Sequence, residues 1–210
     1  MAITLYYAPM SSATRAFWAL EELGIPFEKV KLDLRAGDQK KPEYLKINPN
    51  GKVPALVDGE AKIFENLAIL FHLGERYGVE KGLWPKADSS VRAEAYSWSV
   101  WGLVELVQGA RHFALHADAS HFPGLLPPER RVGWIAEQAR KEWEQNAALL
   151  EARLENRAYI LGDAFSLADV TVAGNAAFGL RMAGLPMGPR ATDWVGRCMA
   201  RPAFARSMAG

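Results

Sequence analysis

The chain has 210 residues, of which 50% are hydrophobic and 23% are charged, a balance typical of a globular protein with one large or two small domains. Its formal net charge of +1 at pH 7 creates no long-range field, so neither nucleic acid nor an anionic membrane is favoured as a partner. No apolar run approaches the roughly 18 residues of a membrane span, and no secretion signal is evident. A single cysteine excludes a disulfide framework within the chain. These three observations predict a cytoplasmic protein.

Strand and helix patterns alternate in the first part of the chain. Short β-rich runs typical of strands occupy four ranges: 3–7, 27–34, 55–57 and 61–64. Apolar residues recur with helical spacing over 12–23 and 65–77. The segment between the last two strands, Asp-Gly-Glu, is typical of a hairpin turn. This order predicts a small α/β domain with one right-handed crossover, over residues 1–78.

The remainder of the chain is predicted to be helical. A linker at 79–87 is followed by helical patterns at 89–116, 128–154, 166–182, 193–199 and 202–208. Residues 119–128 hold three prolines and a glycine, which predicts a loop. The sequence therefore predicts an all-α second domain over residues 88–210.

Residues 47–54 read INPNGKVP, and an acid and an amide follow at the start of the next helix. The Val53–Pro54 step can hold a cis peptide and turn a backbone edge outward, and such an edge can pair with a peptide ligand as an added strand. Glu65 and Asn66 lie at a helix N-terminus, where backbone N–H groups attract a carboxylate. Together these features predict a cradle for a small peptide.

A second local motif lies near the C-terminal end. Ser166 and Asp169 have the spacing of a capping box, and Phe165 and Val170 have the spacing of a hydrophobic staple. This motif predicts the start of a helix and concerns folding, not chemistry.

Three stretches, in order, resemble the cytosolic glutathione transferases. The first strand and helix of that family resemble residues 5–15, LYYAPMSSATR. Its glutathione-binding half resembles residues 47–58, INPNGKVPALVD, together with Glu65 and Asn66. Its folding motif resembles residues 161–169, LGDAFSLAD. The resemblance implies a thioredoxin-like N-terminal domain followed by an all-helical C-terminal domain. It also implies a protein that activates the thiol of glutathione as a thiolate for attack on an apolar electrophile. The alternatives on this scaffold are a glutathione-dependent isomerase, dehalogenase or peroxidase, or a binding module without turnover.

Two adjacent serines are candidates to stabilise that thiolate. Ser11 and Ser12 lie where the first strand gives way to the first helix, where serine is also a common N-cap. A hydroxyl donor near a helix N-terminus favours a thiolate and lowers the pKa of the thiol. The resemblance points to Ser11, which matches the serine of the delta-like and theta-like branches, whereas Ser12 stands where the bacterial beta class has cysteine. A tyrosine-type enzyme would use Tyr6 or Tyr7 instead.

The resemblance assigns the peptide-binding roles to five residues. Val53, before Pro54, would pair its backbone N–H and C=O with the cysteinyl part of glutathione. Glu65 would meet the γ-glutamyl ammonium, and Asn66 stands where the family usually has a serine that meets the α-carboxylate. Lys52 would meet the glycyl carboxylate, or it is a solvated loop lysine.

The resemblance places the wall for the second substrate in the loop after the first strand and in the first long helix. The candidates are Met10, Tyr96, Trp101 and His112, although an aromatic stripe on a helix more often faces a core. His112 and His116 have i, i+4 spacing without a third ligand, so no metal is expected. No second cysteine lies near Cys198, which argues against dithiol exchange.

The resemblance also implies a homodimer. The helical patterns at 89–116 and from 128 carry more apolar residues than one packing seam needs, which is consistent with a covered face.

Overall fold

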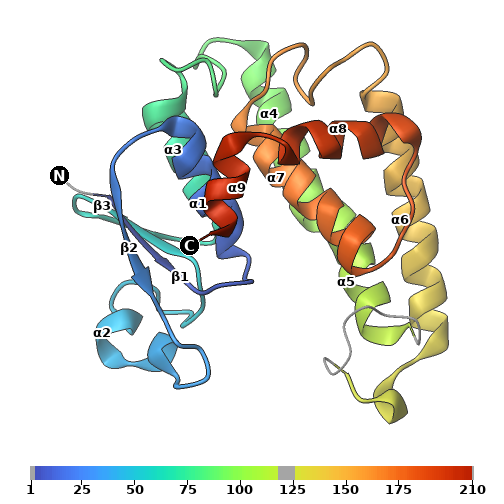
Figure 1. Cartoon of the computed structure of the whole chain (residues 1–210), viewed down its shortest axis with the longest axis horizontal. Coiled ribbons are helices and arrows are strands. Elements are labelled where there is room, and N and C mark those ends of the chain that lie inside the picture. The colour runs from blue at the N-terminus through green and yellow to red at the C-terminus, as the bar shows by residue number, and fades with distance from the viewer. Residues whose placement is uncertain (1–2, 118–125, 210) are drawn as a thin grey trace. The chain divides into compact units, whose positions relative to one another are not determined.

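The computed structural model describes residues 3–117 and 126–209, and the chain forms two compact units (Figure 1). One unit comprises Met1–Lys86 with Ala200–Gly210, and the other comprises Ala87–Met199. The last helix thus shares a unit with the first strand, and the domain boundaries drawn from the sequence stay predictions. Residues 119–125 of the predicted loop lie outside the described residues. Within the described part of the chain, no helix is both long enough and apolar enough to cross a membrane.

A mixed four-stranded sheet forms the centre of the first unit, with strand order β2-β1-β3-β4 (Figure 1). The strands are β1 Ile3–Tyr7, β2 Phe27–Lys31, β3 Ala55–Asp58 and β4 Ala61–Phe64. β1 runs parallel to β2 and antiparallel to β3, and β3 and β4 form the predicted hairpin. β2 ends earlier than predicted, because the Asp33 N–H donates to the Asp38 carboxylate and turns the chain.

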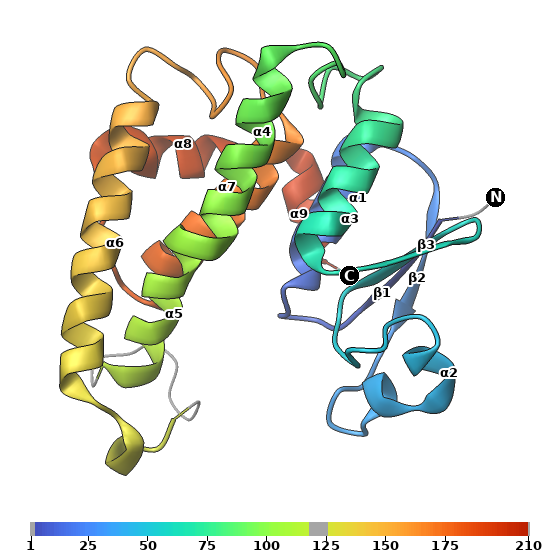
Figure 2. The ribbon, with the colours of Figure 1, turned by 180° about the vertical axis from the view of Figure 1, so that it is seen from behind.

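Helices α1 Ala13–Leu23 and α3 Asn66–Leu73 lie on the same face of this sheet (Figure 2). Both are buried along the face that meets the strands, where Leu5, Leu20 and Leu70 are at most 1% exposed. α1 ends at Gly24, whose φ of 60° suits glycine and whose N–H donates to the Leu20 carbonyl. A short helix α2, Pro42–Leu45, precedes the loop at 47–54, and α3 continues as a π-helical turn, Gly74–Gly78. This unit also contains a 3-10 helix, Asp38–Lys40, and helix α9, Pro202–Met208.

The second unit is all-helical in its described residues, as predicted. Its helices are α4 Ser90–Trp101, α5 Val107–His116, α6 Gly133–Arg153, α7 Leu167–Ala177 and α8 Pro189–Met199. π-helical turns, Gly102–Leu106 and Phe178–Met182, join α4 to α5 and extend α7. The helical patterns predicted from the sequence run through these turns, and apolar periodicity did not distinguish a single π turn from the α-helix around it.

The core of the helical unit is organised around Trp143, which is completely buried. Its indole N–H donates to the Pro186 carbonyl at 2.8 Å. A Cβ at Gly179 would lie only 1.9 Å from the Trp143 ring, so this position in the π turn admits only glycine. Close packing of this kind leaves the helices little freedom to shift.

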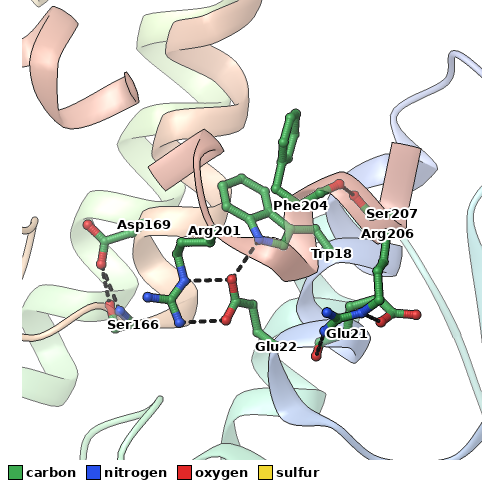
Figure 3. A network of polar contacts seen from close by, with 9 residues as sticks. All are labelled: Trp18, Glu21, Glu22, Ser166, Asp169, Arg201, Phe204, Arg206 and Ser207. Atoms are coloured by element: carbon green, nitrogen blue, oxygen red, sulfur yellow. Dashed lines mark hydrogen bonds and ion pairs between the residues drawn. The ribbon is translucent and has the colours of Figure 1, made fainter. Parts of the chain in front are cut away.

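The predicted capping box is confirmed at the start of α7. Ser166 and Asp169 make both reciprocal bonds, and the Asp169 carboxylate also accepts the Ile160 N–H at 2.9 Å and the Trp194 indole N–H at 3.0 Å. Burial of this carboxylate raises its pKa, although bonds from the Ile160 and Trp194 N–H groups and from the Ser166 N–H and hydroxyl (Figure 3) oppose that shift. The motif therefore ties the start of α7 to a preceding loop and to α8. The thioredoxin-like unit followed by a helical unit confirms the fold class predicted from the sequence.

Candidate active site

The loop before β3 is held rigid by its own polar groups. Asn48, which is 2% exposed, donates through Nδ2 to the Lys52 carbonyl at 2.6 Å, and the Tyr44 hydroxyl donates to the same oxygen at 2.6 Å. Gly51 has a φ of 60°, and a Cβ there would lie 2.7 Å from Lys40 Nζ. The Val53–Pro54 peptide is cis, as the sequence predicted. The bonds from Asn48 and Tyr44 therefore hold the loop in which Val53 lies, two residues before β3.

Ser12 lies next to this loop. Its hydroxyl donates to the Val53 carbonyl at 3.4 Å, which is a long hydrogen bond. The side-chain Nδ2 of Asn66 donates in turn to the Ser12 carbonyl. The structure thus brings together three candidates that are 41 and 54 residues apart in sequence.

Glu65 and Asn66 differ sharply in their environments. Glu65 is exposed and has a φ of 69°, an uncommon backbone conformation for a residue with a side chain. The Asn50 amide donates to the Glu65 carboxylate at 3.4 Å, and the Glu65 carbonyl accepts the Ile69 N–H, which is the first i to i+4 bond of α3. Asn66 is 7% exposed and uses one amide hydrogen on Ser12. The exposed Glu65 carboxylate therefore belongs to the residue directly before the N-terminal turn of α3.

The hydroxyl protons of Ser11 and Ser12 are used differently. Ser11 is half-buried, donates to the Ala8 carbonyl at 2.6 Å and accepts the Ala13 N–H at 3.2 Å. Ser12 is exposed, and among the described residues its hydroxyl donates to the Val53 carbonyl through a long bond. Each hydroxyl has one proton to donate, so turning it toward a ligand breaks the bond that it makes within the protein. That costs less for the long bond of Ser12 than for the short bond of Ser11, whereas the family resemblance favours Ser11.

The two strand tyrosines point to opposite faces of β1. Tyr6 packs its ring against Tyr44, with centroids 5.7 Å apart. Tyr7 is 8% exposed and packs edge-on against Phe17 at 5.9 Å. Only Tyr7 therefore lies on the side of α1.

A pocket of about 70 Å³ opens beside this end of α1. It is lined by residues of the loop after β1, of α1 and of α9: Tyr7, Ala8, Pro9, Met10, Thr14, Phe17, Ser207 and Met208. Met10, a predicted substrate contact, has a φ of 54° and is 93% exposed. The two α9 residues were not foreseen, because the sequence places no motif there and the helix lies almost 200 residues away from the loop.

The other predicted substrate contacts lie on the helical unit. The Tyr96 hydroxyl accepts a bond from Arg92 Nε at 3.2 Å, and Trp101 packs edge-on against Trp98 at 5.1 Å. His112 is exposed and lines a polar groove of about 250 Å³ with these residues of the same unit: Val104, Glu105, Gln108, Glu142, Gln145 and Asn146. Among the described residues, no three His, Cys, Asp or Glu side chains form a group that could hold a metal ion.

Comparison with known proteins matches both parts of the chain to family models. Residues 1–75 match "Glutathione S-transferase, N-terminal domain", and residues 119–202 match "Glutathione S-transferase, C-terminal domain". The chain is 34% identical to glutathione S-transferase 3 of Zea mays over 99% of this chain and 93% of the relative. It is 31% identical to the disulfide-bond oxidoreductase YfcG of Escherichia coli K12 over 98% of this chain and 94% of the relative.

Solved structures share the fold. A theta class glutathione S-transferase from Xanthomonas axonopodis pv. citri, solved with glutathione bound, superposes with a TM-score of 0.82 at 25% identity. The match covers 100% of this chain and 98% of that one.

Proposed function

The chain belongs to the glutathione S-transferase family, and we propose that it is a serine-type glutathione transferase that activates the thiol of glutathione for attack on an apolar electrophile. The observation that carries this proposal is the convergence of Ser12, Val53 and Asn66 through two hydrogen bonds. A hydroxyl, a peptide edge and a helix N-terminus thereby lie together. These are the groups that a thiol-containing peptide with a free carboxylate needs.

Glutathione would occupy the cradle in one orientation. The Val53 backbone, in the loop held by Asn48 and Tyr44, would pair with the cysteinyl residue. The exposed Glu65 carboxylate would bind the ammonium, while the α3 N-terminus and Asn66 would bind the α-carboxylate. Lys52, whose side chain is exposed, would meet the glycyl carboxylate.

The serine hydroxyl would supply the chemistry of activation. A hydrogen bond donated to the sulfur favours the thiolate over the thiol and lowers the pKa of glutathione from its usual value of about 8.5. The thiol proton leaves to solvent, the sulfur forms a bond to the electrophilic carbon, and the leaving group departs as an anion. No protein cysteine is needed, and Cys198 is fully buried.

One relative supports a second candidate function. The similarity to YfcG, a disulfide-bond oxidoreductase, favours a thiol–disulfide exchange in which the thiolate of glutathione attacks a disulfide sulfur and releases the other sulfur as a thiolate. Because the lone cysteine is buried, both exchanging thiols would come from ligands. Calorimetry with glutathione, followed by assays with an aryl halide and with a mixed disulfide, separates the two activities. Glutathione binding without turnover in either assay would instead identify a binding module.

We also propose a cytoplasmic homodimer, as the family resemblance implies. Large apolar side chains are exposed on the helical unit, among them Val100 at 42%, Val104 at 53% and Trp134 at 71%. Patches of this kind often mark a protein interface, and a two-fold pair is the commonest closed assembly.

A further inference from the structure

Met10 holds an uncommon backbone conformation beside the candidate serines. Its φ of 54° lies in the left-handed region, where the Cβ of an ordinary residue crowds the following carbonyl oxygen. Met10 follows Pro9, and a proline followed by a left-handed residue is typical of a type II turn, whose third position favours glycine or asparagine. The methionine side chain is 93% exposed, so packing contributes little to this conformation. Local hydrogen bonds therefore have to hold it.

The side chain of Ser11 closes this turn. Its hydroxyl donates to the Ala8 carbonyl at 2.6 Å, across Pro9 and Met10, and its oxygen accepts the Ala13 N–H at 3.2 Å. One end of the turn is thus fixed to the first residue of α1, and the other end follows directly on β1. The short bond between Ser11 and Ala8 is consequently the contact that keeps the turn closed around Met10.

The same hydroxyl is a candidate donor to the thiolate of glutathione. A hydroxyl has one proton, so Ser11 has to release the Ala8 carbonyl before it can donate to the sulfur. Releasing this bond costs free energy, but it also opens the turn and lets Met10 return to a negative φ. The strain of a left-handed residue and the net contribution of one hydrogen bond are of the same order of magnitude. Relief of the strain therefore offsets much of the cost of turning Ser11 toward a ligand.

The positions of the left-handed residues support a functional role for this strain. Among the described residues, Met10, Glu65 and Asn156 are the non-glycine residues with a positive φ. Asparagine is several-fold enriched in this conformation, so Asn156, an exposed residue after α6, is an ordinary case. Met10 and Glu65 instead lie in the segments that lead into α1 and α3, at the candidate site. Strained residues of this kind cluster at active sites, where the surrounding structure holds them.

We propose that Met10 is a positioning residue that stores backbone strain in the free protein and releases it when Ser11 turns from the Ala8 carbonyl to the thiolate of glutathione. This inference rests on the proposed function, with Ser11 as the donor. Met10 acts through Ser11, and its contribution comes from its backbone conformation, not from its thioether. Because the strain is relieved only when Ser11 donates to the sulfur, its release favours the thiolate over the thiol.

Two substitutions of Met10 separate the strain from the side chain. Met10→Ala removes the thioether and keeps the strain, whereas Met10→Gly removes both, because glycine adopts a positive φ without a steric penalty. Both variants should fold, since the methionine side chain is exposed. Met10→Gly should melt about 1–4 °C above Met10→Ala, because the relief of strain exceeds the entropy that glycine adds to the unfolded chain. Equal melting temperatures would show that there is no strain to release and would overturn the inference.

The pKa of bound glutathione, followed through the absorbance of its thiolate, tests the release. This pKa should be about 0.7 higher in Met10→Gly than in Met10→Ala, which corresponds to an about fivefold weaker preference for the thiolate. The affinities of the two variants for S-methylglutathione should agree within about twofold, because a thioether is a weak acceptor and does not draw Ser11 away from Ala8.

Two outcomes of this comparison would overturn the inference alone. Equal pKa values in the two Met10 variants, with glutathione bound, would show that Ser11 does not release Ala8, as expected if Ser12 is the donor. A fivefold difference in affinity for S-methylglutathione would tie the opening of the turn to binding of the peptide and not to the thiolate. Failure of glutathione to bind the unmodified protein would instead overturn the proposed function, and the inference would fall with it.

Asn156→Ala and Asn156→Gly are the matched control pair, since Asn156 is exposed, has a φ of 59° and belongs to the helical unit. The glycine variant of this pair should also melt above the alanine variant, but both should give the same pKa for bound glutathione. A pKa difference as large as that of the Met10 pair would show a general effect of glycine and would overturn the inference. A crystal structure of the unmodified protein with glutathione, at a pH above the pKa of the bound thiol, should show a negative φ at Met10. A positive φ in that complex would overturn the release.

Discussion

The Asn66 side chain donates a hydrogen bond to the backbone carbonyl of Ser12, so the first residue of α3 is joined directly to the residue that precedes α1. A bond of this kind couples the two halves of the proposed glutathione cradle. The Ser12 hydroxyl donates to the Val53 carbonyl, which links both helices to the loop before β3. Ser12, Val53 and Asn66 therefore belong to one connected network of hydrogen bonds.

The first prediction concerns the ammonium site. Glu65→Ala should weaken glutathione binding by about 1.5–3 kcal/mol, the range for a hydrogen bond to a charged group, because the ammonium would lose its anionic partner. Titration calorimetry measures this change. Glu60→Ala is the matched control, since Glu60 is an exposed acid in the nearby hairpin turn and should leave affinity unchanged. Equal affinities for Glu65→Ala and the unmodified protein would remove Glu65 from the site.

The second prediction distinguishes the serines. The serine that donates to the sulfur should, when changed to alanine, raise the apparent pKa of bound glutathione and lower turnover at pH 7 while leaving affinity nearly unchanged. The thiolate absorbance of the bound peptide, followed against pH, gives that pKa. The family resemblance favours Ser11. The longer hydrogen bond that the Ser12 hydroxyl donates within the protein favours Ser12, because that bond is more easily given up. If Tyr7→Phe alone has the effect, the serine-type assignment is wrong.

The third prediction concerns acid stability. Burial raises the pKa of the Asp58 carboxyl, but hydrogen bonds from His72 and Tyr77 and the charge of Arg76 outweigh burial and hold the pKa below its usual value. A carboxylate with a lowered folded-state pKa binds protons more readily when unfolded, so its contribution is complete above the unfolded pKa of about 3.9 and is lost as the pH falls through the folded pKa.

Urea unfolding between pH 2.5 and pH 6 should therefore show stability declining below about pH 4. Asp58→Asn should reduce stability at pH 6 by about 1–3 kcal/mol and flatten the decline, because the charged partner is lost at every pH. A variant with an equally steep decline would show that other carboxylates dominate the acid response.

Local motifs were predictable from the sequence, whereas contacts between distant segments were not. The bonds between Ser166 and Asp169 lie within one turn, so spacing alone reveals them. The bond from Trp194 to the same carboxylate joins residues 25 positions apart, and the Arg201–Glu22 pair joins residues 179 positions apart. No periodicity encodes such pairs, because each depends on how complete helices pack.

The same distinction applies to the candidate site. Ser12, Val53 and Asn66 could be identified because each belongs to a short motif of a known family. The contribution of α9 to the pocket could not, since Met208 belongs to no motif and its position follows from the packing of α9 against α1.

The fourth prediction concerns the capping box. Asp169→Ala would leave the buried N–H groups of Ile160 and Trp194 without an acceptor, in addition to removing the cap. A lost cap costs about 0.5–2 kcal/mol and each unsatisfied buried donor about 1–3 kcal/mol, so the loss should exceed about 3 kcal/mol. Thermal unfolding measures it, with Asp163→Ala, at an exposed position, as the control. A loss below 1 kcal/mol would indicate that water replaces the carboxylate.

The last prediction concerns assembly. Val104 is 53% exposed on the π turn between α4 and α5, and Val100 is 42% exposed on α4, so both offer apolar surface to a partner. In a homodimer that covers this surface, Val104→Glu would place a charge in an apolar contact and should raise the fraction of monomer at micromolar concentration. Light scattering gives the mass of the species. Val30→Glu is the control, because Val30 is exposed on an edge strand of the other unit and should leave the mass unchanged. A monomer mass for the unmodified protein, with full activity, would refute the dimer; a dimer that persists in Val104→Glu would place the interface on another face.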